Sequence, residues 1–261
     1  MTFITLLGVT LALVLGMMLV LWLVSLMVKD ASIVDSFWGV GFAAIGWVSF
    51  FLTDGAAPRK FLITSLVTIW GLRLGLHIFS RNHGKGEDYR YRAMRKQWGD
   101  KFPLVSLITV FGLQGLLMWF ISMPVQIAQT SATPANFILF DYLGIGVWLI
   151  GFFFEAVGDF QLRQFKGNPA NKGKVMDVGL WRYTRHPNYF GDATLWWGYF
   201  LIACAVPMGY LTFFSPLLMT FFLMKVSGVA LLEKSLKKSK PGYLEYVART
   251  SSFFPLPPKK A

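Results

Sequence analysis

Ionisable side chains interrupt several long apolar stretches of this 261-residue sequence. Arg73 and His77 are four residues apart, and Glu155 and Asp159 repeat that spacing, so each pair shares one face of a helix. Carboxylates, guanidinium groups and an imidazole on such faces bind polar ligands and transfer protons. Because a charged side chain inside a membrane is costly, it marks a functional site by default. These residues therefore predict a polar site built from apolar helices.

A second cluster lies in residues 179–192, which read Gly-Leu-Trp-Arg-Tyr-Thr-Arg-His-Pro-Asn-Tyr-Phe-Gly-Asp. Pro187 suits the first turn of a helix. The free backbone N–H groups of that turn, together with the cations before it, attract an anion such as a diphosphate. A basic turn that contacts lipid phosphate is the alternative interpretation. The cluster adds six residues to the candidate site, Arg182, Tyr183, Arg185, His186, Asn188 and Asp192.

The elements that must position these residues are membrane helices. The sequence is 55% apolar and only 15% charged, whereas a soluble domain carries about a quarter charged residues. A helix needs about 20 mainly apolar residues to cross the hydrocarbon region. Seven segments meet this requirement, at residues 3–28, 33–52, 61–80, 104–127, 137–162, 189–206 and 210–232. The fold class is therefore predicted as all-α, integral membrane, in one seven-helix domain over residues 1–261.

The lysine and arginine residues behind the net charge of +12 are unevenly distributed between the loops. Residues 81–101, 163–185 and 234–260 hold most of these cations, whereas the alternate loops hold few. The positive-inside rule then places the N-terminus outside and the C-terminus in the cytoplasm. The polar residues gather toward the cytoplasmic helix ends, which favours an enzyme pocket over a transport path.

Composition also argues against several other classes of protein. One cysteine, Cys204, does not make a disulfide scaffold, and the basic excess needs no nucleic-acid partner once topology explains it. No Gly-x-Gly-x-x-Gly run follows a strand, so a nucleotide would have to be held by membrane helices and basic loops. We expect no metal site and infer no obligatory protein partner; membrane lipids surround the chain.

For single residues, structural roles without a function in a site remain alternatives. Arg81 and Arg163 at helix ends are suited to reach lipid head groups. A structural ion pair of Glu155 and Asp159 with Arg73 is the alternative for those carboxylates, and a satisfied core position is the alternative for a lone His77. Asn188 and Asp192 repeat the same four-residue spacing on a third helix. The co-location of these three polar stripes at one depth favours a site.

The run from Arg185 to Asp192, Arg-His-Pro-Asn-Tyr-x-Gly-Asp, resembles a signature shared by steroid 5α-reductases, sterol reductases and isoprenylcysteine-type methyltransferases. Residues 159–166, Asp-Phe-Gln-Leu-Arg-Gln-Phe-Lys, are similar to a run of the steroid 5α-reductase family, and Lys174 stands where that family has an arginine. Arg73, His77 and Arg81 follow the spacing of its cofactor-contacting helix. The chain resembles a bacterial member of this family over roughly residues 30–250.

The resemblance implies seven transmembrane helices, NADPH bound from the cytoplasmic side of an inner membrane, and a cofactor half at about residues 137–250. It implies reduction of the carbon–carbon double bond of an enone lipid, such as a Δ4-3-oxosteroid to the 5α-reduced 3-oxosteroid. The cofactor residues implied are Arg73, His77, Arg81, Glu155, Asp159, Arg163, Lys166, Lys174, Arg182, Tyr183, Arg185, His186, Asn188 and Asp192.

The family polarises the substrate carbonyl with a glutamate and a tyrosine, for which Asp35 and Trp70 are the nearest candidates here. An apolar pocket around Asp35 would keep its carboxyl protonated and able to donate to the ketone. Two other functions stay open. One is a methyltransferase that uses S-adenosylmethionine on a lipid or prenylated thiol, and the other is a lipid-binding scaffold without enzymatic activity.

Overall fold

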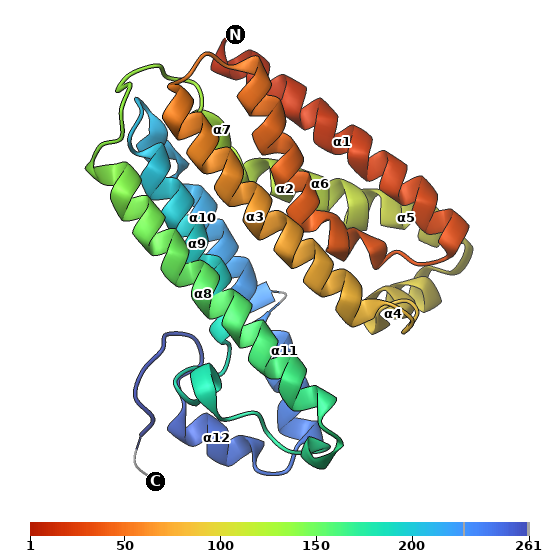
Figure 1. Ribbon diagram of the computed structural model, residues 1–261. Helices are drawn as coiled ribbons and strands as arrows, with labels where there is room; N and C mark the ends of the chain where they lie inside the picture. Colours follow the sequence, from red (N-terminus) through yellow and green to blue (C-terminus); the bar gives the residue numbers. More distant parts are fainter. Residues whose placement is uncertain (227, 260–261) are drawn as a thin grey trace. The chain divides into compact units, whose positions relative to one another are not determined.

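The chain is helical throughout the part that the structure describes, which is residues 1–226 and 228–259 of a computed structural model. An isolated backbone bridge between Thr184 and Ser251 is its one extended pairing in those residues. The helices are α1 (Phe3–Val28), α2 (Ile33–Leu52), α3 (Ala57–Asn82), α4 (Tyr89–Trp98), α5 (Phe102–Ser106), α6 (Leu113–Ile121), α7 (Met123–Ile127), α8 (Leu139–Gly167), α9 (Pro187–Ala203), α10 (Phe214–Phe221), α11 (Val229–Ser239) and α12 (Tyr243–Arg249) (Figure 1).

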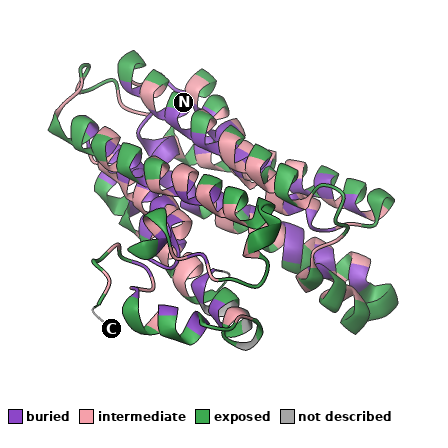
Figure 2. Ribbon diagram, turned by 60° about the horizontal axis from the view of Figure 1, so that its bottom comes forward, coloured by how far each residue is buried: buried purple, intermediate pink, exposed green. Residues whose placement is uncertain are grey.

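Six helical segments of the described chain are long and apolar enough to cross a membrane: Phe3–Val28, Ile33–Leu52, Ala57–Asn82, Tyr89–Ile121, Leu139–Gly167 and Gly209–Val226. Large apolar side chains on them face outward, with Ile4 and Met27 both 82% exposed and Phe51 74% exposed. Figure 2 shows exposed residues along the whole length of these long helices. Such surfaces are stable in lipid rather than in water. The chain is therefore an integral, multi-pass membrane protein.

The predicted spans compare unevenly with these helices. Segments 3–28 and 33–52 coincide with α1 and α2. Segment 104–127 is not one regular helix, because a π-helical stretch at Leu107–Gly112 separates α5 from α6, and a turn at Ser122 separates α6 from α7. The predicted span 189–206 corresponds to α9, which has 17 residues and is not among the six. A seventh crossing therefore stays a prediction.

The chain forms two compact units. The first comprises Met1–Ile138 and Ala203–Thr212, and the second comprises Leu139–Ile202 and Phe213–Ala261. In the first unit, α2 packs against α3 and α1, and α1 packs against α6. The contact between α2 and α3 is very close, because a Cβ atom on Gly39 would lie 2.1 Å from the carbonyl oxygen of Gly71. The two glycines allow these helix backbones to touch.

In the second unit, α8 and α9 pack through glycines. A Cβ atom on Gly151 would lie 2.4 Å from the backbone nitrogen of Leu195, and one on Gly191 would lie 2.3 Å from that of Glu155. One face of α8 is buried, and Trp148, Glu155 and Asp159 lie on it. The close packing brings the polar residues of α8 next to the first turns of α9.

Candidate functional site

The polar residues of α8 and α9 meet at the start of α9. The Asn188 side-chain amide donates to Asp159 Oδ1 at 3.0 Å, and the carboxylate is 7% exposed. Pro187 is the first residue of α9, as predicted, and its ring lies against α8, since a Cβ atom on Gly158 would be 3.1 Å from Pro187 Cγ. Asp159 and Asn188, predicted from separate motifs, are therefore hydrogen-bonded to each other.

Two polar atoms of α9 are buried without a hydrogen bond to any described residue, one at the start of the helix and one near its end. Asn188 Oδ1 and the Tyr199 hydroxyl are buried, and neither has a hydrogen-bond partner among the residues that the structure describes. Trp148 Nε1 on α8 is in the same state, and its ring lies edge-on to Tyr199 with centroids 6.5 Å apart. Because buried polar groups are normally satisfied, the Asn188 acceptor fits a donor group of a polar ligand. Tyr199 lies about 16 Å further along the axis of α9 and does not belong to the same cluster. Tyr199 was missed in the sequence, although it lies on the same helix as Asn188 and Asp192.

The Arg-His-Pro segment is tied to the C-terminal part of the chain instead of facing solvent. Arg185 is 8% exposed, and its Nε atom donates to Glu233 Oε1 at 2.7 Å. His186 Nε2 lies 3.4 Å from the same oxygen. Arg185 also donates to the backbone carbonyls of Val247 and Thr250. These two predicted cofactor residues thus form an internal ionic cluster in this structure.

Glu233 is the acidic centre of this cluster. Burial by itself raises the pKa of the Glu233 carboxyl, but contacts with His186 and Arg185 and their charges outweigh burial and lower it to about 2. The sequence offered one signal for this residue, a carboxylate at the end of the last apolar segment.

The remaining cations predicted in this unit lie on its surface. Arg163, Lys166, Lys174 and Arg182 are all exposed. Tyr183 is 44% exposed, and its backbone carbonyl accepts a hydrogen bond from Leu256 N at 3.0 Å. Glu155 is 2% exposed and Asp192 is half-buried. The unit thus combines buried carboxylates with an exposed basic rim.

A separate polar network surrounds Asp35 in the first unit. Arg90 Nη2 donates to Asp35 Oδ2 at 2.7 Å, and the Tyr91 hydroxyl donates to Oδ1 at 2.7 Å. Gln114 Nε2 donates to the Tyr91 hydroxyl at 3.2 Å, and Trp38 Nε1 donates to Gln114. Asp35 is therefore not surrounded by apolar side chains alone, because both of its carboxylate oxygens accept hydrogen bonds.

Trp70, the other predicted catalytic residue, is fully buried, and its ring packs against Phe42 with centroids 5.5 Å apart. Tyr91, which contacts Asp35, was missed. It lies 56 residues further along the chain, in a basic amphipathic helix whose pattern shows no such contact.

The helical face predicted on α3 belongs to the first unit. Arg73 and His77 are half-buried and Arg81 is exposed, so burial decreases along the stripe toward the end of the helix. Arg81 Nε donates to Asn82 Oδ1 at 3.2 Å. Within the described residues, no group of three or more histidines, cysteines or acidic residues is arranged to hold a metal ion.

Comparison with known proteins places the chain in a family. The sequence pattern of DUF1295, described as a protein of unknown function, matches residues 21–250. The chain belongs to this family. The match includes the Asp35 network, the α3 stripe and the α8–α9 site of this DUF1295 protein, and it ends at Thr250 in the C-terminal part.

One relative of this DUF1295 protein is the uncharacterized protein C594.04c of Schizosaccharomyces pombe. The two are 26% identical over 277 residues, which cover 95% of this chain and 78% of the yeast protein. No solved structure matches the chain.

Proposed function

We propose that this DUF1295 protein is an NADPH-dependent reductase of the conjugated carbon–carbon double bond of an enone lipid. A Δ4-3-oxosteroid reduced to the 5α-reduced 3-oxosteroid is the substrate we favour. The hydrogen bond between Asn188 and Asp159 carries this proposal, because it joins the two motifs that resemble the steroid 5α-reductase family. We further propose that the protein acts without an obligatory protein partner.

The residues of the second unit fit the proposed cofactor. Asn188 Oδ1 is a buried acceptor without a partner among the described residues, which suits an amide or hydroxyl donor of a dinucleotide. Arg163, Lys174 and Arg182 are exposed cations suited to phosphate groups. NADPH, when bound, would supply the hydride that adds to the β-carbon of the enone. Glu155, Asp159 and Asp192 would orient the sugar and amide groups by accepting hydrogen bonds.

We propose that the Asp35–Tyr91 pair polarises the substrate carbonyl. The Tyr91 hydroxyl donates to Asp35 Oδ1 at 2.7 Å and accepts a hydrogen bond from Gln114 Nε2 at 3.2 Å. When an enone binds, the hydroxyl would exchange Asp35 for the carbonyl oxygen as its acceptor and donate to that oxygen as negative charge develops there. Arg90, which donates to Asp35 Oδ2 at 2.7 Å, would hold the pair in place.

We also propose a location. A short seventh crossing by α9 would put the N-terminus outside and the C-terminus in the cytoplasm, with the cofactor residues at the cytoplasmic face of a bacterial inner membrane. The basic segment 163–185 and the tail would then lie on the same side. A membrane thinner than average, or tilted neighbouring helices, would accommodate the 17 residues of α9.

Two measurements on purified full-length protein in detergent test the proposal. The first compares the rise in melting temperature caused by NADPH, NADH and S-adenosylmethionine. The second follows NADPH oxidation with a progesterone-like enone. We expect stabilisation by NADPH and enone-dependent oxidation. Stabilisation by S-adenosylmethionine alone would contradict the reductase proposal and favour the methyltransferase. No stabilisation by any of the three compounds would favour a lipid-binding scaffold.

A further inference from the structure

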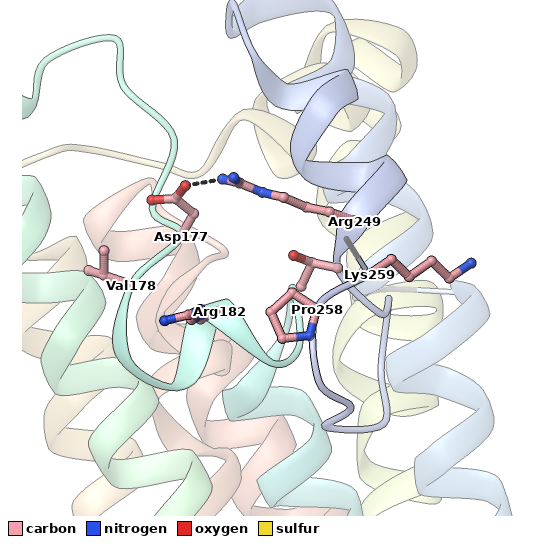
Figure 3. Close-up of a pocket in the computed structure, with 7 residues that line it drawn as sticks. Asp177, Val178, Arg182, Arg249, Pro258 and Lys259 are labelled. Atoms are coloured by element: carbon pink, nitrogen blue, oxygen red, sulfur yellow. Dashed lines mark hydrogen bonds and ion pairs between the residues drawn. The ribbon is translucent and has the colours of Figure 1, made fainter. Parts of the chain in front are cut away.

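A cavity of about 460 Å³ lies in the second unit, between the segment that follows α8 and the C-terminal tail (Figure 3). The residues that line it include Asp177, Val178, Arg182, Arg249, Pro258 and Lys259. Of these residues, only Arg182 belongs to the set predicted to bind the cofactor. The cavity thus combines a predicted cation with residues from the C-terminal end that no motif had indicated.

Positive charge dominates the wall of this cavity. Its ionisable residues are three cations, Arg182, Arg249 and Lys259, and one carboxylate, Asp177. The carboxylate accepts a hydrogen bond from Arg249, as Figure 3 shows. Arg182 is exposed and makes no hydrogen bond or ion pair through its side chain within the described part of the chain. One carboxylate therefore leaves two positive charges without compensation.

Hydrogen bonds hold the walls in place. The tail is fixed to the Arg-His-Pro segment by Leu256 N, which donates to the Tyr183 carbonyl at 3.0 Å, and by Thr184 Oγ1, which donates to the Phe253 carbonyl at 2.8 Å. Lys259 N donates to the Arg249 carbonyl at 2.9 Å. Because these bonds set the distance between tail and loop, the cations are arranged before any ligand arrives.

The ligand must match both the charge and the surroundings of the cavity. A phosphomonoester carries about −1.5 to −2 charges at neutral pH and offers three acceptor oxygens. Arginine binds such a group through two parallel hydrogen bonds. Val178 lines the same cavity and is 58% exposed, so an apolar group next to the phosphate also finds a contact.

We propose that this cavity binds a phosphomonoester group attached to an apolar or aromatic body, with Arg182 and Arg249 as its principal ligands. Two sources share this chemistry. One is the 2′-phosphate of NADPH next to its adenine ring, in which case the site deepens the proposed function and rests on it. The other is the headgroup of phosphatidic acid in the adjacent leaflet, which requires no reductase activity.

The experiment measures binding to purified full-length protein of 2′-AMP, 5′-AMP and adenosine in detergent, and of phosphatidic acid against phosphatidylcholine in nanodiscs. The variants are Arg182→Gln, Arg249→Gln and Asp177→Asn, with Lys172→Gln as a matched control, since Lys172 is an exposed cation of the same loop that does not line the cavity. We expect each arginine variant to weaken phosphate-dependent binding about tenfold, because each removes hydrogen bonds to a charged group. Asp177→Asn should strengthen binding, because it releases Arg249 from its carboxylate partner.

The possible outcomes separate the sources and the two proposals. Binding of 2′-AMP in preference to 5′-AMP, sensitive to Arg182, supports the nucleotide source. Binding of phosphatidic acid with the same sensitivity supports the lipid source, whatever the result of the NADPH oxidation assay. If no phosphomonoester binds more tightly than adenosine or phosphatidylcholine, or if Lys172→Gln weakens binding as much as Arg182→Gln, the site does not exist. Melting temperatures of all variants establish that a loss of binding is not a loss of fold.

Discussion

Arg185 Nε donates to Glu233 Oε1 at 2.7 Å, and this ion pair joins the Arg-His-Pro segment to α11. Both side chains are largely inaccessible, at 8% and 12% exposure. The same guanidinium donates to the carbonyls of Val247 and Thr250 at the end of α12. Arg185 therefore connects three parts of the second unit. These contacts hold the Arg-His-Pro segment in place before any ligand binds at the start of α9.

Glu233→Gln should lower the stability of the protein. The substitution leaves Arg185 buried without a carboxylate partner, and hydrogen bonds to charged groups contribute about 1.5–3 kcal/mol each. We expect a lower melting temperature in detergent. Glu245→Gln on α12 is the matched control, because Glu245 is exposed. Equal melting temperatures for the two variants would show that the Arg185–Glu233 pair adds nothing to stability.

Acid should remove the contribution of Glu233 in a defined range of pH. The pKa of Glu233 is about 2 in the folded protein, against an ordinary value of 4.5. A lowered pKa means that the stabilisation is fully present above the ordinary value and is lost as the pH falls toward the folded value. The difference in melting temperature between wild type and Glu233→Gln should therefore shrink between about pH 4.5 and pH 2. A difference that is constant over this range would assign the stabilisation to something other than the charge.

The sequence predicted long uniform helices well and irregular contacts poorly. Segments 3–28 and 33–52 match α1 and α2 because charged or polar residues bound two continuous apolar runs. Segment 104–127 has an equally uniform apolar composition, but composition alone does not distinguish α-helical from π-helical hydrogen bonding at Leu107–Gly112. The prediction therefore gave the approximate position of a membrane segment and not its interruptions.

The candidate site divides in the same way. Asp159 and Asn188 were both predicted as site residues from motifs and helical spacing, whereas the hydrogen bond between them was found only in the structure. The Tyr91 contact with Asp35 left no signal, because its partner is 56 residues away and hydrophobic periodicity does not encode such pairs. The hydrogen bond from Thr184 to Phe253 joins two irregular segments, which have no hydrophobic periodicity from which a contact could be predicted.

Tyr91→Phe and Asp35→Asn should each lower kcat by about 10²-fold, the lower end of the effect of general acid catalysis. The KM for NADPH should stay within about twofold, because both residues belong to the proposed polarising pair and not to the cofactor residues. The assay is NADPH oxidation with a saturating enone. Tyr89→Phe is the control, since Tyr89 is 62% exposed on the same helix α4. An unchanged kcat for Tyr91→Phe would remove the pair from the reaction.

Asp159→Ala and Arg163→Ala should raise the KM for NADPH about tenfold, because each removes a hydrogen bond to a charged or polar group of the proposed cofactor. Asn188→Asp should have a similar effect, since it brings a second carboxylate to the position of an amide that donates to Asp159 at 3.0 Å. Initial rates over a range of NADPH concentrations measure these changes, with Lys172→Gln as control. Unchanged NADPH dependence in all three variants would exclude these residues from the cofactor site.

Gly39→Ala should destabilise the first unit, whereas Gly8→Ala should not. A methyl group on Gly39 would lie 2.1 Å from the Gly71 carbonyl oxygen, and that oxygen belongs to a helix backbone that is unable to turn aside. Overpacking of this kind costs about 1–3 kcal/mol or more. No atom lies within 4 Å of the corresponding position on Gly8, where alanine improves helix propensity by up to about 1 kcal/mol. Melting temperatures of the two variants should therefore move in opposite directions. A wild-type melting temperature for Gly39→Ala would show that the backbones of α2 and α3 are not in contact at Gly39 and Gly71.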